Sequence, residues 1–415
     1  MELLAPGGNL EKLKTSVLYG ANAVYLAGQK FSLRGGSENF SDTEIMEGVA
    51  FAKEKNCKVY VTLNSFLHDE EIHHLKEYVK ILESCGVDAV IVSDLGVMTV
   101  VQQNSKLPIH LSTQASCLNI NAAKLWKNLG AKRLVLGREV SIEEASKIKK
   151  EVGIEVELFI HGAMCMAYSG NCTISNYTSG RDSNRGGCIQ SCRFYYTAVP
   201  VKSELNDDFQ EESPSSLLSS KDLRAIELLP KFLEAEIDSI KIEGRMKSSL
   251  YAATTSSAYS RALKLCESTS PKELQYKLKE LSKMLEKIPH RGYTEGSLSR
   301  HPDGKSIYYG GRNSINSRYE FAGTVVEVEG SSSFIILTQN SIDNFCTLEI
   351  LNFDGNVIEV SAQEMETISK KSVLRSNPNS LIRFPYSSSI SKNDGSVISK
   401  IEPFNVVRML TGIAN

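Results

Sequence analysis

The chain has no strong net charge, no hydrophobic run long enough to cross a membrane, and no pattern typical of a secretion signal. Its 47 lysines and arginines nearly balance its 49 aspartates and glutamates, so overall charge predicts no general attraction to nucleic acid or membranes. Apolar runs such as DAVIVSD have only the length of a strand. The segment MELLAPGGNL lacks the basic and apolar regions of a signal peptide. We therefore expect a cytoplasmic protein without membrane contact, in which any nucleic acid binds to a local patch.

Three common catalytic motifs are also missing. No G-x-G-x-x-G follows the first apolar run, which argues against a dinucleotide-binding fold. In HDEEIHH, the residue four positions after His68 is Ile72, so this segment does not present the paired histidines of a zinc peptidase. The G-x-S-x-G turn of serine hydrolases is absent as well. The chemistry of this chain must therefore depend on other residues.

Short apolar runs recur between residues 2 and 245, and amphipathic helical stretches separate them. Unbroken apolar strands are typical of a parallel sheet that is buried on both faces. Eight such strands with intervening helices predict an α/β fold, a (β/α)8 TIM-like barrel, rather than an open doubly wound sheet. The predicted strands are 2–6, 23–27, 58–64, 88–94, 108–114, 133–139, 155–162 and 238–245.

The segment between the seventh and eighth strands is much longer than the other connections. We expect a barrel domain at 1–265 with an insertion at 163–220, which leaves the carboxyl end of the seventh strand, where such barrels place their chemistry. Residues 266–319 predict a helical linker. From 320 to 415, apolar and polar residues alternate, and Asp-Gly pairs at 354–355 and 394–395 mark hairpin turns. This region predicts a small C-terminal antiparallel β-barrel.

Four of the nine cysteines lie in the insertion with the spacing C-x6-C-x15-C-x3-C, at Cys165, Cys172, Cys188 and Cys192. Disulfides are not expected in a reducing compartment, whereas clustered thiolates bind zinc or an iron–sulfur cluster. Only the last pair has the short spacing of a zinc knuckle, so the pattern favours an iron–sulfur cluster, with zinc as second choice. The alternative is that some of these are buried free thiols. We interpret the other five cysteines in that way: Cys57, Cys85, Cys117, Cys266 and Cys346.

A resemblance to a known family rests on the same segment. ELFIHGAMCMAYSGNCTIS, from Glu157 to Ser175, closely resembles the signature of peptidase family U32, the collagenase-like peptidases. LSTQAS at 111–116, NRGGC at 184–188 and KIEGRMK at 241–247 are similar to further blocks of that family in the same order. With the C-terminal β-region, the resemblance extends over nearly the whole chain.

The resemblance implies an activity other than proteolysis. Better understood bacterial members are oxygen-independent hydroxylases that carry a [4Fe–4S] cluster on cysteines at these positions. The branch with this length forms 5-hydroxyuridine at the wobble position of tRNA with prephenate as hydroxyl donor. Sister branches hydroxylate a cytidine of ribosomal RNA or the ubiquinone ring. Arg224 stands where a ubiquinone-type member would carry a fourth cysteine, and this favours the tRNA branch. A redox partner is a further expectation.

A small dianion such as prephenate requires cationic side chains at the barrel rim. Three arginines are candidates for this role: Arg34 in the second β/α loop, Arg138 after the sixth strand and Arg245 after the eighth. Each of them can alternatively pair with a nearby carboxylate, such as Glu139 or Glu243.

Four further residues at strand ends are candidates for the site. His161 is the best general acid or base, because imidazole titrates near neutral pH, although a structural histidine is an equal alternative. Glu243 is a second candidate for proton transfer or for fixing Arg245. Asn64 and Gln114 are candidates for neutral hydrogen bonds to a substrate.

Binding of RNA would depend on the surroundings of the cysteines. The basic candidates are Arg181, Arg185, Arg193, Arg245 and Lys247, and the aromatic ones are Tyr168, Tyr177, Phe194, Tyr195 and Tyr196. The aromatic residues from 194 to 196 can alternatively belong to a strand or core segment. Two other functions stay open: a peptidase with a Cys165/His161 dyad, and a non-catalytic metal-stabilised scaffold that binds RNA.

Overall fold

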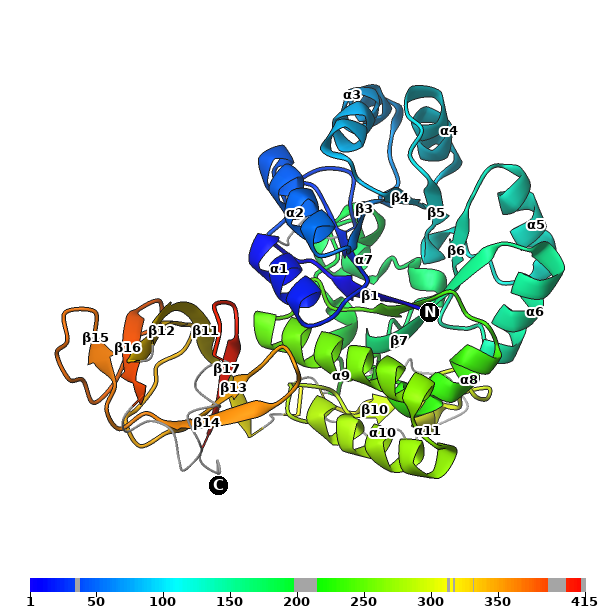
Figure 1. Ribbon diagram of the computed structural model, residues 1–415. Helices are drawn as coiled ribbons and strands as arrows, with labels where there is room; N and C mark the ends of the chain where they lie inside the picture. The colour runs from blue at the N-terminus through cyan, green and yellow to red at the C-terminus, as the bar shows by residue number, and fades with distance from the viewer. Residues whose placement is uncertain are drawn as a thin grey trace.

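The alternation of apolar strands and helices produces a closed parallel barrel, as the sequence predicts. The computed structural model describes residues 1–33, 38–197, 215–311, 314–315, 318–330, 332–386 and 401–411. Within these residues, strand β9 pairs in parallel with both β1 and β7, and this closes the ring (Figure 1). The barrel strands are β1 (Glu2–Pro6), β2 (Ala23–Leu26), β3 (Lys58–Leu63), β4 (Ala89–Val92), β5 (Ile109–Leu111), β6 (Arg133–Val135), β7 (Glu155–Ala163) and β9 (Ser239–Ile242).

Helices surround this ring and bury their apolar faces against it. Their ends follow local sequence signals: in α6, Ser141 accepts from the Glu144 amide at 3.2 Å, and Glu144 Oε2 accepts from the Ser141 amide at 2.8 Å. The outer helices are α1 (Leu10–Leu18), α2 (Asp42–Glu54), α3 (Asp69–Cys85), α4 (Leu95–Asn104), α5 (Ile120–Asn128), α6 (Ile142–Val152), α8 (Leu229–Glu234) and α9 (Ser249–Ser268).

The interior of the barrel contains a charged layer, although TIM barrels usually fill this space with branched apolar side chains. Glu157 is fully buried and accepts from Lys241 Nζ at 3.0 Å and from Arg133 Nη1 at 3.2 Å. Arg133 also contacts Glu2 and Glu155. Burial alone would raise the pKa of Glu157, but the charges and hydrogen bonds of Lys241 and Arg133 hold this pKa below its ordinary value. The layer therefore consists of paired charges.

Two short strands extend the sheet beyond the predicted barrel. Strand β8 (Asp222–Arg224) runs antiparallel to β7, and β10 (Tyr293–Thr294) pairs with β8. The segment expected to be a linker contains α10 (Pro271–Leu285), β10 and α11 (Gly304–Ile307). Its side chains Leu274, Leu278 and Leu281 belong to the main hydrophobic core, so this segment is part of the barrel domain's packing. Such short strands carry no sequence periodicity by which they could be predicted.

The C-terminal region is an antiparallel sheet with its own core, as predicted. In the described residues it curls into a half-barrel whose edge strands β14 and β15 are not paired with each other. The predicted turn at Asp354-Gly355 joins β13 to β14, whereas the one at 394–395 lies outside the described residues. In order across the sheet, the strands are β14 (Val357–Ser361), β13 (Thr347–Leu351), β17 (Val406–Leu410), β11 (Tyr319–Glu329), β12 (Ser333–Thr338), β16 (Leu381–Pro385) and β15 (Glu366–Thr367).

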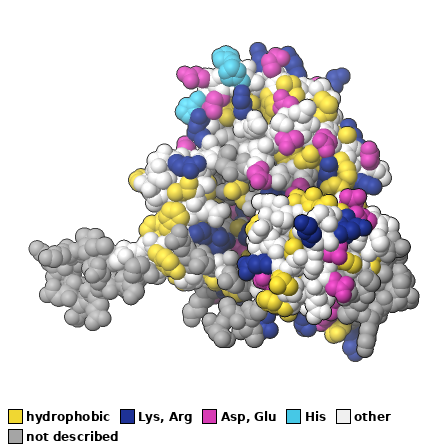
Figure 2. Space-filling view, turned by 90° about the vertical axis from the view of Figure 1, so that its left-hand side faces the viewer, with side chains coloured by type: hydrophobic (Ala, Val, Ile, Leu, Met, Phe, Trp, Pro, Cys, Tyr) yellow, Lys and Arg dark blue, Asp and Glu magenta, His cyan; other side chains and the backbone are white. Residues whose placement is uncertain are grey.

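The surface carries charges of both signs. Figure 2 shows basic and acidic side chains interspersed over the face in view, without a field of one sign. Among the described residues, no helix has both the length and the apolar composition needed to cross a bilayer. Any strongly charged site must therefore be sought in a cavity rather than on this face.

Candidate functional site

A cavity of about 370 Å³ lies at the carboxyl ends of the barrel strands, beneath the insertion. Its walls come from the loops after β3, β5, β6, β7 and β9 and from the described part of the insertion. This is the end at which TIM barrels hold their active sites, because the variable βα loops meet there. The position predicted for the cysteine-bearing insertion is therefore also the position of the cavity.

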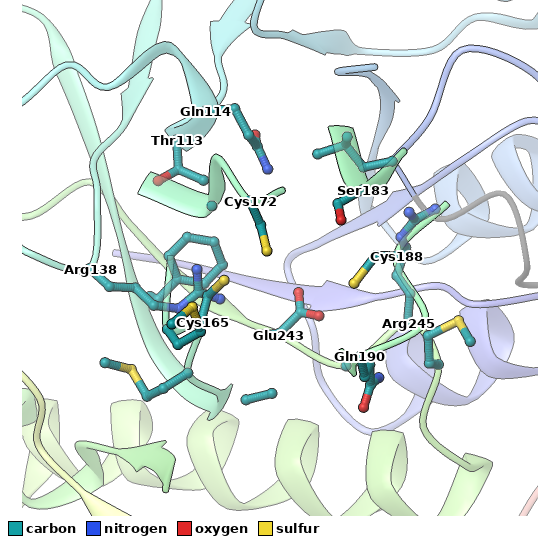
Figure 3. Close-up of a pocket in the computed structure, with 18 of the residues that line it drawn as sticks. Thr113, Gln114, Arg138, Cys165, Cys172, Ser183, Cys188, Gln190, Glu243 and Arg245 are labelled. Carbon is teal, nitrogen blue, oxygen red and sulfur yellow. The ribbon is translucent and has the colours of Figure 1, made fainter. Parts of the chain in front are cut away.

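All four insertion cysteines line this cavity. Figure 3 shows the sulfur atoms of Cys165, Cys172 and Cys188 around the space that the Glu243 carboxylate enters. The electrostatics of Cys192 also reflect this convergence. Burial raises the pKa of its thiol, Arg193 lowers it, and repulsion by Cys165, Cys188 and Cys172 raises it further. The four cysteines are widely and unevenly spaced in the sequence, but all of them lie in the wall of one cavity.

Hydrogen bonds within the insertion hold this group together. The Asn184 side chain donates to the Cys172 carbonyl at 3.0 Å and accepts from the Cys172 amide at 3.3 Å. Ser191 lies between the hydroxyls of Ser175, at 3.2 Å, and Thr178, at 2.7 Å. These contacts join the short helix α7 (Ile174–Ser179) to the segment that carries Cys188 and Cys192.

Arg193 fixes the first cysteine of the set rather than binding RNA. Its side chain is buried and donates to the carbonyl oxygens of Met164 at 2.9 Å and Ser220 at 2.6 Å. Met164 directly precedes Cys165, so this arginine anchors the start of the insertion to its end. Its location could not be predicted from the sequence, because two of its partners are backbone carbonyls and the third is the Ser219 hydroxyl at 3.1 Å.

The remaining cysteines differ from this set. Burial raises the pKa of Cys57 to about 12 and that of Cys117 to about 11, so both stay protonated thiols at neutral pH. Cys85 is also buried, and Cys266 and Cys346 are half-buried. Cys165, in contrast, is exposed to the cavity. The described residues contain no three His, Cys, Asp or Glu side chains arranged around a single metal ion.

The cavity is rich in cations although the chain as a whole is slightly acidic. Its lining includes six basic side chains and one acidic side chain, Glu243. The basic residues are Arg138, Arg193, Lys241, Arg245, Lys247 and Arg291. Burial lowers the pKa of Lys247, which indicates that its charge has incomplete compensation in this state. A small anion is the ligand that such a lining favours.

Arg138 is the clearest ligand-binding candidate among the predicted arginines. Its guanidinium lies 3.9 Å from the centroid of the Phe159 ring, and its buried Nε has no hydrogen-bond partner. The alternative partner Glu139 does not pair with it: Glu139 Oε1 accepts from the Ser169 amide at 2.8 Å, and its Oε2 is buried without a partner. Lys241, which the sequence did not single out, lies 5.7 Å from the same Phe159 ring. Arg138 and Lys241 therefore both lie close to the Phe159 ring in the cavity wall.

Glu243 and Arg245 reach the cavity from the end of β9, as predicted. Tyr25 donates to Glu243 Oε2 at 3.2 Å, and Arg245 Nη2 donates to Ser32 at 3.0 Å. A close approach of β7 supports this arrangement: Gly162 has a φ of +104°, and a Cβ there would stand 2.3 Å from the Glu243 carbonyl oxygen. Only glycine fits at this position.

Asn64 and Gln114 lie together in the cavity wall. Asn64 Nδ2 donates to Gln114 Oε1 at 3.4 Å, and the Ser112 hydroxyl donates to the same oxygen. Gln114 belongs to the short helix η1 (Thr113–Ala115), not to the end of β5 as the sequence suggested. Both side chains line the cavity, where they can form hydrogen bonds to a ligand.

His161 does not line the cavity. Its ring is 1% exposed, contacts Tyr251, Tyr259 and Tyr293, and its Nδ1 lies 3.2 Å from the Tyr259 hydroxyl. Burial lowers its pKa to about 3, and the charges of Arg224 and Lys247 add to this effect. The reason is an irregularity in the β7–β9 register between Phe159 and His161, which reverses the side on which the next side chains point. This placement favours the structural role that the sequence left open.

Three other sequence-based candidates have different outcomes. Arg34 lies outside the described residues. Arg224 pairs with Glu286 at 3.1 Å and lies over the Tyr293 ring, away from the cysteines. Arg185 is bound to Glu71 at 2.9 Å and to the Phe66 carbonyl at 2.8 Å. Arg185 and Arg193 thus both have partners within the protein.

Comparison with known families matches residues 8–308 to the model of peptidase family U32. The chain belongs to peptidase family U32. The match covers the barrel from α1 through β9, including the insertion with its four cysteines.

Three relatives within this similarity carry names that describe different activities. tRNA hydroxylation protein P1 of Bacillus subtilis is 39% identical over 92% of this chain and 94% of its own length. The 23S rRNA 5-hydroxycytidine C2501 synthase of Escherichia coli is 36% identical over 63% of this chain and 39% of its own length. A collagenase of Porphyromonas gingivalis is 29% identical over 71% of this chain and 72% of its length. The similarity to the first relative is thus the most extensive of the three.

Proposed function

We propose that this protein hydroxylates RNA, and specifically that it forms 5-hydroxyuridine at the wobble position of tRNA. The observation that carries the proposal is the convergence of four thiols on one cation-lined cavity. Its support from comparison is the extensive similarity to a protein named for tRNA hydroxylation and to one named for hydroxylation of ribosomal RNA. Replacing the hydrogen at C5 of the base by a hydroxyl group is a two-electron oxidation. The hydroxyl comes from prephenate, the proposed donor, which becomes aromatic as it loses this hydroxyl and CO2. A redox partner accepts the two electrons that are released, and the proton that leaves C5 goes to the cavity and solvent.

Cys165, Cys172, Cys188 and Cys192 are the proposed ligands of a [4Fe–4S] cluster. The donor set fits, because such clusters bind cysteine thiolates. A cluster is larger than one ion, so its ligands line a shared space without meeting at one point, and the four cysteines do line one cavity. When bound, the cluster would carry the electrons released by this oxidation, one at a time, to a redox partner.

The chain's own residues would bind and orient the co-substrate. Arg138 offers a buried Nε donor without a partner at 3.9 Å from the Phe159 ring centroid, and Lys241, held in place by Glu157, offers a cation at 5.7 Å from the same centroid. A dicarboxylate such as prephenate can contact both cations at once. Arg245 is a further proposed contact for the anion, and Asn64 and Gln114 are proposed contacts for its hydroxyl or for the base. Arg34, which lies outside the described residues, stays a candidate on the basis of the sequence alone. Glu243 is the acidic group in this lining and the proposed proton acceptor.

The peptidase alternative has little support in the site. His161 makes its hydrogen bond to Tyr259 and, within the described residues, none to Cys165, so the proposed dyad is not formed. A neutral imidazole behind the cavity wall is poorly placed to activate a thiol.

Nucleoside analysis of RNA tests the proposal directly. A strain that lacks the gene is complemented with the wild type, with Cys172→Ser, or with the matched control Cys117→Ser, whose thiol is buried away from the cavity. We expect 5-hydroxyuridine-derived nucleosides to return with the wild type and Cys117→Ser only. Unchanged tRNA with altered ribosomal RNA or quinone would assign the protein to a sister activity. If all three are unchanged in the deletion strain, the hydroxylase proposal is wrong.

A further inference from the structure

Two exposed tyrosines stand close in the sequence to residues that line the cavity, and two exposed methionines line it. Tyr177 on α7 is 90% exposed, and Tyr168 on the short helix η2 (Tyr168–Gly170) is 63% exposed. Each is next to residues that line the cavity: Gly170 follows Tyr168, and Ile174 precedes Tyr177 by less than one helical turn. Met166 and Met246 line the cavity and are exposed as well, which marks them as part of its opening.

The charges around this mouth are less available than the sequence indicates. Arg185 is paired with Glu71, Arg193 is buried on backbone carbonyls, and Arg245 lies inside the cavity. Of the arginines in the described part of the insertion, Arg181 is the exposed one, and no ion pair involves it. The mouth is therefore predominantly aromatic and only weakly basic, while the cavity below it is strongly basic.

We propose that Tyr168 and Tyr177 are a stacking platform for unpaired bases that flank the modified nucleotide of a single-stranded RNA loop. The inference rests on the proposed function, because that function makes RNA the occupant of this mouth. A base that enters the cavity must leave its stack, and its neighbours then lose a stacking partner. Exposed tyrosine rings at the entrance replace that partner for any base type.

This arrangement has a consequence for specificity. Stacking requires exposed base faces, so the platform selects unpaired RNA over a duplex, whose bases already stack on one another. Because few cations surround the mouth, phosphate contacts contribute little to this binding. Each phosphate contact on a single strand adds about −0.7 to the slope of log affinity against log salt concentration. We expect a total slope shallower than about −2, in contrast to a protein that binds RNA through a basic patch.

Fluorescence anisotropy with a labelled RNA hairpin tests the inference. The probe carries unpaired uridine-containing loop nucleotides, and the same RNA annealed to its complement is the competitor. We expect Tyr177→Ala and Tyr168→Ala each to weaken binding by roughly 5- to 100-fold, because loss of one stacked base costs this much. Tyr177→Phe, which keeps the ring, should bind like the wild type. Thermal unfolding of each variant verifies that the fold is intact.

A matched control is available on α10, outside the cavity lining. Tyr276 on α10 is 66% exposed and does not line the cavity, so Tyr276→Ala should bind RNA like the wild type. The inference is overturned if Tyr177→Ala and Tyr168→Ala bind normally, if Tyr276→Ala is equally impaired, or if duplex and hairpin bind alike. A change in oligomeric state in Tyr177→Ala would also overturn it, since the face would then be a contact between copies.

The outcomes separate this inference from the proposed function. If hairpin binding depends on the tyrosines but tRNA from the deletion strain keeps its 5-hydroxyuridine, the platform stands and the proposed reaction fails. If the reaction occurs in the cell while Tyr168→Ala and Tyr177→Ala bind and react normally, the reaction stands and the platform fails.

Discussion

At one end of the barrel interior, Glu157 accepts hydrogen bonds from Lys241 and Arg133, and Arg133 in turn contacts Glu2 and Glu155. At the other end, Arg138 has a buried Nε without a partner, and cations outnumber carboxylates in the cavity lining. Both regions belong to the same barrel. The first satisfies its charges internally, and the second leaves positive charge unsatisfied.

This difference indicates which charges serve the fold and which serve a ligand. Buried ions that are fully paired hold their neighbours in place, whereas an unpaired buried donor costs free energy that only a ligand recovers. Lys241 connects the two regions, because its ammonium pairs with Glu157 and also lies in the cavity lining. The charged layer thus places a fixed cation under the site.

The largest effect is expected from breaking the paired layer. Glu157→Gln leaves the buried Lys241 without its carboxylate and removes one of the carboxylates of Arg133, so it should lower the free energy of unfolding by about 3–5 kcal/mol. Glu155→Gln is the matched control, because Glu155 is half-exposed and should cost less than about 1 kcal/mol. Urea unfolding measures both. If both variants lose the same free energy of unfolding, the buried pairs of Glu157 stabilise the protein no more than the half-exposed pair of Glu155.

A smaller effect is expected at the unpaired end, and it should appear in binding rather than in stability. Arg138→Ala should weaken prephenate binding by roughly 10- to 150-fold, as loss of a charge-assisted hydrogen bond implies. Its free energy of unfolding should change by less than about 1 kcal/mol, since Arg138 loses only its contact with Phe159. Arg138→Lys should recover little affinity, because one ammonium lacks the guanidinium fork.

Calorimetric titration of prephenate into the anaerobic protein measures this affinity. If Arg138→Ala binds prephenate normally but is strongly destabilised, Arg138 belongs with the structural charges and the comparison fails.

The smallest effect concerns two buried histidines, one at each end. Burial lowers the pKa of both His110 and His161 to about 3, whereas the unfolded chain has histidine pKa values of about 6.5. Below pH 6.5 the unfolded state therefore binds protons that the folded state does not, and stability falls with pH. Each histidine should cost about 1.4 kcal/mol per pH unit below that value.

Urea unfolding at pH 7.5 and pH 5.5 measures this loss. In His161→Asn, the loss of unfolding free energy between the two pH values should be smaller by the contribution of one histidine. Stability that is the same at both pH values would mean that neither ring is held neutral. If His161→Asn abolishes RNA hydroxylation with the fold and prephenate binding intact, the structural role of His161 is wrong.

The sequence predicted the barrel well because its strands are unbroken apolar runs, and it predicted the cysteine group because all four thiols lie in one insertion. It did not predict β8 and β10, which are too short to show periodicity. The position of His161 depends on a register irregularity in β7, and the role of Arg193 depends on backbone carbonyls far along the chain. Pairing across strands, as between Glu157 and Lys241, likewise requires the register that only the structure provides.

Iron and sulfide analysis of the anaerobically purified protein tests the central claim most directly. The wild type and Cys117→Ser should contain about four iron atoms per chain and the visible absorption of an iron–sulfur chromophore, as a [4Fe–4S] cluster requires. Cys172→Ser and Cys188→Ser should lose most of both while remaining folded. A colourless wild type without iron, or full iron content in both serine variants, would contradict the account.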